Sequence, residues 1–127
     1  MSPALERRLL QVAIAVAGLV PVGGGIWGAL GQMTTAGAAS TSNARYLSGL
    51  LLAIGLTFWI CIPTIERRGA VFRALAAIIV VGGVARLAGA VLVTGFPPEV
   101  SLPLVMELGV TPLLAIWRER VERRLAA

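Results

Sequence analysis

Long apolar stretches separated by short polar segments make up most of this sequence. Four such runs cover residues 9–30, 46–65, 71–94 and 100–117. Each run approaches the roughly 20 residues that a helix needs to cross the hydrocarbon core of a bilayer. Because lipid offers no hydrogen bonds to a backbone, each run is expected to form a helix that satisfies its own backbone groups. The pattern therefore predicts an all-α protein with four membrane-spanning helices in one domain, residues 1–127.

The segments between the runs predict an antiparallel, up-down four-helix transmembrane bundle. Residues 31–43 are rich in Thr, Ser, Gly and Ala and are predicted to be a flexible polar loop, whereas the Phe-Pro-Pro-Glu sequence at residues 96–99 predicts a tight, stiff turn. The apolar part of the first run exceeds the roughly 7–15 residues of a secretory signal. An uncleaved first helix is therefore favoured. The last helix is expected to extend into a cytoplasmic tail.

The arginines predict the orientation of the bundle. All basic residues are Arg, and nine of the eleven lie at one side of the predicted helices. These nine are Arg7, Arg8, Arg67, Arg68, Arg73, Arg118, Arg120, Arg123 and Arg124. Arg45 alone lies at the opposite side. Because positively charged loops stay in the cytoplasm, both termini are predicted to be cytoplasmic, with the tail arginines against anionic lipid headgroups.

Composition narrows the function classes. The chain is 57% hydrophobic and 13% charged, against about 25% charged residues in an ordinary soluble domain. Its net charge of +5 does not predict nucleic-acid binding, because the arginines flank apolar runs and form no single basic face. The absence of histidine excludes histidine acid–base catalysis, and a lone Cys61 excludes a cysteine–histidine zinc cluster. The sequence therefore predicts a protein that is not an enzyme and has no metal or cofactor.

Two charged residues interrupt the apolar runs. Arg86 lies in the third run and Glu107 in the fourth. At a rise of 1.5 Å per residue, Arg86 lies about 12 Å and Glu107 about 10 Å below the outer ends of their runs. On neighbouring antiparallel helices the two side chains would be level. Because a charge at this depth is costly unless it is paired or hydrated, we predict an Arg86–Glu107 ion pair, and hence a buried salt bridge.

Three roles are open for this pair. It is a structural clasp that fixes the register of two helices, or it lines a polar pocket that binds a ligand headgroup or a proton, or it faces a protein partner. Thr111 shares the face of Glu107 and is expected to donate a hydrogen bond either to that carboxylate or to its own helix backbone. Pro112 removes a backbone donor and is expected to distort the helix beside Glu107.

Two further polar residues are candidates for the same centre. Arg45 begins the second helix on the outer side; it either reaches lipid phosphate or covers the pocket above Arg86 and Glu107. Tyr46 is expected to act as an interfacial anchor rather than as a ligand contact. In the first helix, Gly24 and Gly28 have the spacing of close helix packing.

Several segments resemble one bacterial membrane-protein family of unknown function with four predicted spans. The resemblance rests on Arg45-Tyr46-Leu47-Ser48-Gly49-Leu50, Pro63-x-Ile65-Glu66-Arg67, Phe72-Arg73-Ala74-Leu75, Gly82-Gly83-x-Ala85-Arg86-Leu87 and Glu107-Leu108 followed by Pro112. More distantly, the architecture is similar to DoxX-like membrane proteins. The resemblance implies a four-helix fold in a bacterial inner (cytoplasmic) membrane and supplies no mechanism.

Three functions follow from these features. The leading hypothesis is a small, non-enzymatic membrane protein that binds a small amphiphile, a lipid or a protein partner around Arg86 and Glu107. One alternative is a homodimeric transporter coupled to protons or ions, in which Glu107 is the coupling carboxylate. The other is an accessory subunit of a larger membrane complex. The expected partners are the lipid bilayer, an amphiphilic ligand, and a second copy or another membrane protein.

Overall fold

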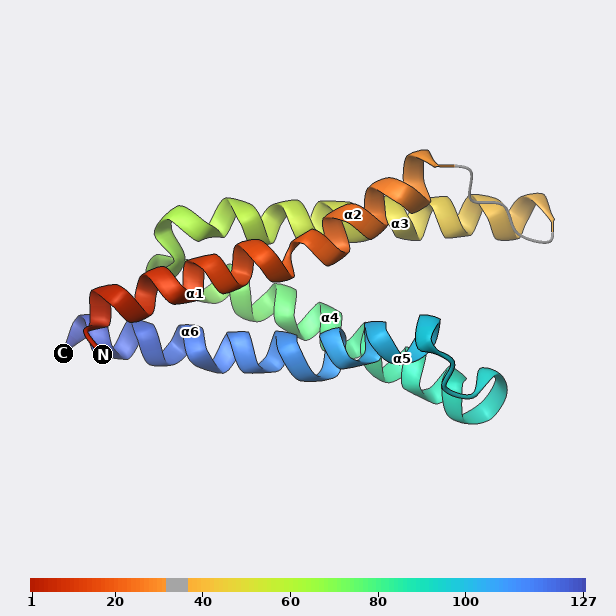
Figure 1. Ribbon diagram of the computed structural model, residues 1–127. Helices are drawn as coiled ribbons and strands as arrows, with labels where there is room; N and C mark the ends of the chain where they lie inside the picture. The colour runs from red at the N-terminus through yellow and green to blue at the C-terminus, as the bar shows by residue number, and fades with distance from the viewer. Residues whose placement is uncertain (32–36) are drawn as a thin grey trace. The chain divides into compact units, whose positions relative to one another are not determined.

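The computed structural model describes residues 1–31 and 37–127, and its regular elements in these stretches are all helices (Figure 1). Four helical stretches are long and apolar enough to cross a membrane: Pro3–Leu30, Ala38–Arg67, Gly69–Thr94 and Pro98–Ala126. The predictions of an all-α chain and of four membrane-length helices are therefore confirmed for the described residues. Together these stretches indicate a multi-pass membrane protein.

Each stretch consists of two or three consecutive elements. In chain order these are α1 (Pro3–Ala17), α2 (Leu19–Leu30), α3 (Ala38–Cys61), the 3₁₀ segment η1 (Ile62–Arg67), α4 (Gly69–Gly89), the π-helix η2 (Ala90–Thr94), α5 (Pro98–Val105), the π-helix η3 (Met106–Val110) and α6 (Thr111–Ala126). Every predicted apolar run lies inside one stretch. The helices continue beyond the runs because polar residues at a helix end are tolerated where they reach water or headgroups.

The predicted polar loop at residues 31–43 is partly wrong. Residues 32–36 lie outside the described part of the chain. From Ala38 onward the segment is already the first part of α3, preceded by Gly37 at φ 96°. The small polar residues of this segment have adequate helix propensity once the helix is continuous with an apolar one, so their composition alone did not mark the boundary.

The first membrane-length stretch is interrupted at Gly18, between α1 and α2. Pro21 follows three residues later, and its missing N–H leaves the carbonyl of Ala17 without its helical donor. The backbone N–H of Val22 still bonds the carbonyl of Gly18 at 3.1 Å, so the helical path resumes immediately. The interruption therefore lies about one helical turn before the proline.

The chain forms two compact units. Unit 1 contains Met1–Leu10 and Thr64–Ala127, and unit 2 contains Gln11–Pro63. In unit 2, α2 packs along α3. The indole N–H of Trp59 donates to the carbonyl of Ala15 at 3.2 Å. The side chain of Gln11 donates to the carbonyl of Ile62 at 2.8 Å.

Close approach of α2 and α3 in unit 2 depends on two glycines. A Cβ on Gly25 would lie 2.6 Å from the backbone nitrogen of Leu52, and one on Gly55 would lie 2.8 Å from a methyl group of Val22. Gly24, singled out by its spacing, has only an ordinary contact of 4.0 Å with Leu51. The prediction of close packing in the first stretch is therefore right, except that the close contact is made by Gly25 instead of Gly24; Gly28 is buried as well.

In unit 1, α4 contacts α5, η3 and α6. The contacts follow opposite sequence order along the two segments, since Arg73 pairs with Glu119 and Arg86 pairs with Glu107. The buried apolar side chains of this unit are Leu10, Ile65, Phe72, Leu75, Ala76, Ala90, Leu104 and Val121. Figure 1 shows both chain termini at one end of this unit. The opposed order sets Arg86 beside Glu107.

Candidate functional site

Arg86 on α4 and Glu107 on η3 form an ion pair within unit 1. The Nε–H group of Arg86 donates to both carboxylate oxygens, at 3.2 Å to Oε1 and 3.0 Å to Oε2, and Nη2 donates to Oε1 at 3.0 Å. Two guanidinium nitrogens therefore donate hydrogen bonds to one carboxylate, and such a bidentate pair is the strongest geometry for arginine and glutamate. The contacts between these two helical segments run in opposite sequence order, and this places Arg86 beside Glu107.

The pair is not enclosed by the protein. The Arg86 side chain is 42% exposed and that of Glu107 is 19% exposed. The predicted ion pair is formed, and buried glutamate–arginine pairs also occur elsewhere in unit 1, but the protein itself leaves the Arg86 side chain partly uncovered. Arg86 is exposed because its neighbours along the same helix face are Gly82 and Gly89, whose missing side chains shield nothing.

Glu107 lies within a π-helix rather than an α-helix. The backbone N–H of Thr111 bonds the carbonyl of Met106, five residues earlier. Pro112 follows and cannot donate, so the wider turn accommodates the loss of one backbone donor. The hydroxyl of Thr111 also donates to the carbonyl of Met106, at 2.9 Å. Of the two roles open for Thr111, its hydrogen bond to its own helix backbone is the one formed.

Gly83 brings α4 close enough for the ion pair. A Cβ at this position would lie 2.9 Å from the Cβ of Glu107 and 2.8 Å from a methyl group of Leu108. Gly82, one residue earlier, faces open space, because a Cβ there would meet nothing within 4 Å. Two adjacent glycines therefore have different roles: one permits helix contact and the other leaves the surface beside Arg86 bare.

This difference gives a matched pair of variants. Gly83→Ala is expected to lower the free energy of unfolding by about 1–2 kcal/mol, because the added methyl group overpacks the contact with η3. Gly82→Ala is expected to raise it by about 0.5 kcal/mol, because alanine restricts the unfolded chain at no steric cost. Unfolding of the micelle-solubilised protein by sodium dodecyl sulfate, followed by helical circular dichroism, measures both. Equal effects of the two substitutions would contradict the packing described here.

Arg45 and Tyr46 belong to unit 2. The guanidinium of Arg45 donates to the carbonyl of Ala29 at 3.0 Å and to that of Gly31 at 2.9 Å. Because the last carbonyls of a helix lack intrahelical donors, Arg45 acts as a cap for the C-terminus of α2. Neither role predicted for Arg45 includes this contact. Tyr46 is 66% exposed, and its role as an interfacial anchor stays a prediction.

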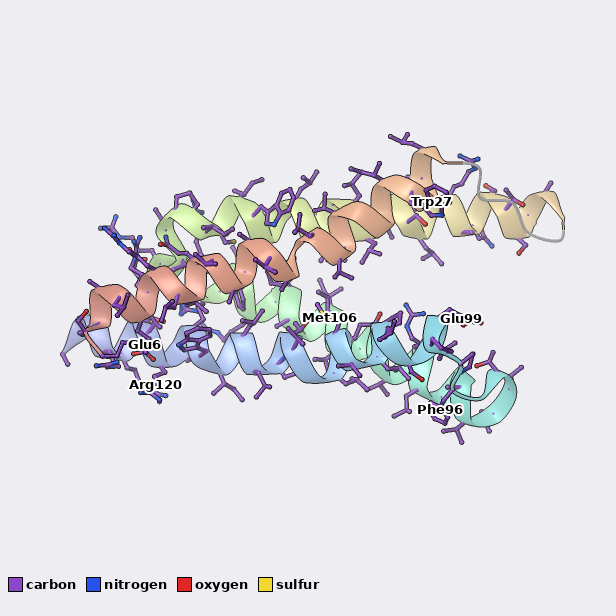
Figure 2. The ribbon with its side chains drawn as sticks, in the orientation of Figure 1. Glu6, Trp27, Phe96, Glu99, Met106 and Arg120 are labelled. Atoms are coloured by element: carbon purple, nitrogen blue, oxygen red, sulfur yellow. The ribbon has the colours of Figure 1, made fainter. Side chains whose placement is uncertain are left out.

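A second polar cluster lies at the arginine-rich end of unit 1. Glu6, in the first turn of α1, is only 5% exposed and accepts hydrogen bonds from the indole of Trp117 at 3.1 Å and from Arg124. Arg120 forms an ion pair with it at 3.1 Å. Figure 2 shows Glu6 and Arg120 together at this end. One carboxylate thus ties the beginning of the chain to α6.

Arg118 follows Trp117 on α6, and 0% of its side chain is exposed. Glu6, Arg118 and their partners together form the Glu6 and Arg118 cluster. Arg118 forms an ion pair with Glu122, lies 3.6 Å from Glu119, and donates to the carbonyl of Ile65 at 3.4 Å. Its Nε has no hydrogen-bond partner among the described residues. Gly69 makes room for the guanidinium, since a Cβ there would lie 2.7 Å from Nη2. The expectation that Arg118 lies against lipid headgroups is therefore wrong.

Comparison with known protein families gives a match that covers most of the chain. A family model described as a domain of unknown function, DUF4345, matches residues 9–118. The chain belongs to this DUF4345 family. No match was found among curated proteins or among solved structures. The resemblance to an uncharacterised membrane family is thus confirmed as far as the family goes.

The part of the chain matched by DUF4345 contains both residues of the Arg86–Glu107 pair. Among the described residues of this DUF4345 protein, no three His, Cys, Asp or Glu side chains are grouped so that they could hold a metal ion. The arrangement at Arg86 is instead suited to hydrogen bonding. It presents guanidinium donors on a surface made bare by glycines, with the positive charge balanced by Glu107.

Sequence reasoning missed the Glu6 and Arg118 cluster. Two signals for it were present: Arg118 and Glu122 are four residues apart on one helix, and Glu6 precedes the first apolar run next to two arginines. Neither signal distinguishes an exposed charged tail from a buried network. Burial of Arg118 requires Gly69 and Ile65 from a distant part of the chain, so only the fold identifies it.

Proposed function

We propose that this DUF4345 protein is a non-enzymatic membrane protein that binds a small amphiphile at the Arg86–Glu107 pair. In this proposal the four membrane-length helices form an antiparallel, up-down bundle in a bacterial inner membrane. The contacts between α4 and the segment from η3 to α6 run in opposite sequence order. This supports the antiparallel arrangement for the third and fourth membrane-length helices. The more distant similarity to DoxX-like membrane proteins is a prediction that agrees with this architecture.

The orientation follows from the arginines. Nine of the eleven lie at the ends of the apolar runs on the side where both chain termini are predicted. Because cytoplasmic segments carry the excess of positive charge, we place this end, with the Glu6 and Arg118 cluster, in the cytoplasm. The Arg86–Glu107 pair then lies in the outer half of the membrane. Of the nine, six are exposed and suited to anionic headgroups: Arg8, Arg67, Arg68, Arg73, Arg120 and Arg123.

One observation carries the binding proposal: an ion pair within membrane-length helices is left partly uncovered. Arg86 lies eight residues before the end of the stretch Gly69–Thr94, yet its side chain is 42% exposed. A purely structural clasp would be better shielded, because a guanidinium that faces hydrocarbon with unsatisfied donors is costly. A polar headgroup bound against Arg86 removes this cost. The same chemistry needs neither a catalytic base nor a metal.

Photo-crosslinking tests the binding site. A long-chain alcohol that carries a diazirine beside its hydroxyl group is added to the full-length protein in nanodiscs, and labelled residues are mapped by mass spectrometry. We expect saturable labelling of α4 and η3 near Arg86 and Glu107. The Arg86→Met/Glu107→Leu variant is expected to lose this labelling, because it removes the polar centre without leaving an unpaired charge.

The chain offers a matched control for this experiment. Arg73 and Glu119 form another ion pair, at 2.8 Å, at the arginine-rich end of the same unit. The Arg73→Met/Glu119→Leu variant is expected to keep the labelling near Arg86. Labelling spread evenly over all four helices, and unchanged by either double variant, would mean that the probe reports bulk lipid. The binding proposal would then be wrong.

A further inference from the structure

The hydrogen bonds of Arg86 leave part of its guanidinium unused. A guanidinium has five N–H donors. The Nε–H group and one Nη2–H group point to Glu107. Both Nη1–H groups and the second Nη2–H group have no acceptor among the described residues. The Arg86 side chain is 42% exposed, so a ligand that contacts these donors must offer hydrogen-bond acceptors.

The charge of the site limits the ligand further. Arg86 and Glu107 together are neutral, because the carboxylate already balances the guanidinium. A headgroup with its own net charge would leave that charge uncompensated within the membrane, which is costly. An uncharged headgroup with carbonyl, ester or hydroxyl oxygens accepts the same hydrogen bonds without that cost. The pair therefore favours uncharged ligands.

The surface around Arg86 has room for such a ligand. Gly82 and Gly89 lie four residues before and three residues after Arg86, on the same side of α4. A Cβ on either glycine would meet nothing within 4 Å. Beyond them the exposed apolar side chains of Ile78 and Leu92 continue the strip. A long apolar chain laid along this strip would keep its head beside the guanidinium.

From these three features we propose that the ligand of the Arg86–Glu107 pair is an uncharged amphiphile whose head carries acceptor oxygens. This inference rests on the proposed binding function and names the chemical class of its ligand. The oxygens accept hydrogen bonds from Nη1 and Nη2 of Arg86, while Glu107 holds the other edge of the guanidinium. The apolar chain lies along the Gly82 and Gly89 surface.

A series of headgroups on one chain tests the ligand class. Monoolein, oleyl sulfate and oleyltrimethylammonium are titrated into nanodiscs that contain the full-length protein with ¹⁵N-labelled arginine. The Arg86 side-chain resonances, assigned by their loss in Arg86→Lys, report binding. We expect a saturable shift with monoolein. Oleyl sulfate is expected to bind at least about tenfold more weakly, and oleyltrimethylammonium not to bind, because each brings an unbalanced charge.

A single substitution should reverse this preference. Glu107→Gln keeps an acceptor for the Arg86 guanidinium but removes the balancing charge, so the site becomes cationic. We expect oleyl sulfate to bind this variant at least about tenfold more tightly than it binds the wild-type protein, since the pair of charges is now formed with the ligand. Glu99→Gln, at an exposed glutamate of α5, serves as the control and should leave the series unchanged.

The outcomes separate the two proposals. If none of the three probes gives a saturable shift at Arg86, the binding function itself is wrong. If oleyl sulfate binds the wild-type protein as tightly as monoolein does, the site binds amphiphiles but the assignment to uncharged ligands is overturned. If Glu107→Gln leaves the preference unchanged, charge balance by Glu107 does not select the ligand, and the inference also fails.

Discussion

Glu122→Ala is expected to lower the free energy of unfolding by about 3 kcal/mol, because it removes the main ionic partner of a fully buried arginine. Arg118 has none of its side chain exposed. Without Glu122 it keeps only the carbonyl of Ile65 at 3.4 Å and Glu119 at 3.6 Å. These longer contacts compensate the buried charge poorly. Unfolding by sodium dodecyl sulfate, followed by helical circular dichroism, measures the loss.

A double variant distinguishes a stranded charge from a lost contact. Replacing both partners, as Arg118→Met/Glu122→Ala, is expected to recover most of the stability, since methionine fills a similar volume and needs no counter-charge. The control is Glu99→Ala, at an exposed glutamate, which should change stability by less than about 0.5 kcal/mol. A double variant less stable than Glu122→Ala alone would contradict this explanation.

Gly25→Ala is expected to destabilise unit 2 by about 3 kcal/mol, at the upper end of the usual cost of overpacking. The added methyl group would lie 2.6 Å from the backbone nitrogen of Leu52 and 2.7 Å from its Cα. A backbone cannot rotate away as a side chain can, so α2 and α3 must separate. The same detergent unfolding experiment measures the effect.

Gly23→Ala is the matched control for this substitution. It lies two residues earlier on α2, and a Cβ there would meet nothing within 4 Å. We expect a small gain of about 0.5 kcal/mol, because alanine reduces the freedom of the unfolded chain. If Gly25→Ala were as well tolerated as Gly23→Ala, the close contact between α2 and α3 would not exist.

The two glycine contacts show where prediction from sequence reached its limit. A spacing of four between Gly24 and Gly28 is typical of helix packing, but the position that faces α3 depends on how α2 is rotated. That rotation follows the interruption at Gly18, which shifts the face of every later residue. The spacing of the glycines predicted a close contact between helices, whereas the rotation of α2 in the fold determined that Gly25 makes it.

The Arg86–Glu107 pair was predictable because two regular constraints act on it. Each residue interrupts an apolar run, and residues equally far from a turn lie at equal depth when the two helices are antiparallel. Its exposure was not predictable. Whether Arg86 is covered depends on the side chains that surround it in the fold, and Gly82 and Gly89 supply none.

By itself the sequence determined the class of molecule, because the lengths of the apolar runs and the positions of the arginines are set by the bilayer as a solvent. It also determined which two charges would meet within those runs. Only the tertiary structure decided which arginine is buried, which carbonyls Arg45 caps and which glycines are in contact. These features depend on residues distant in sequence meeting at atomic contact distances, and no local pattern of hydrophobicity specifies that.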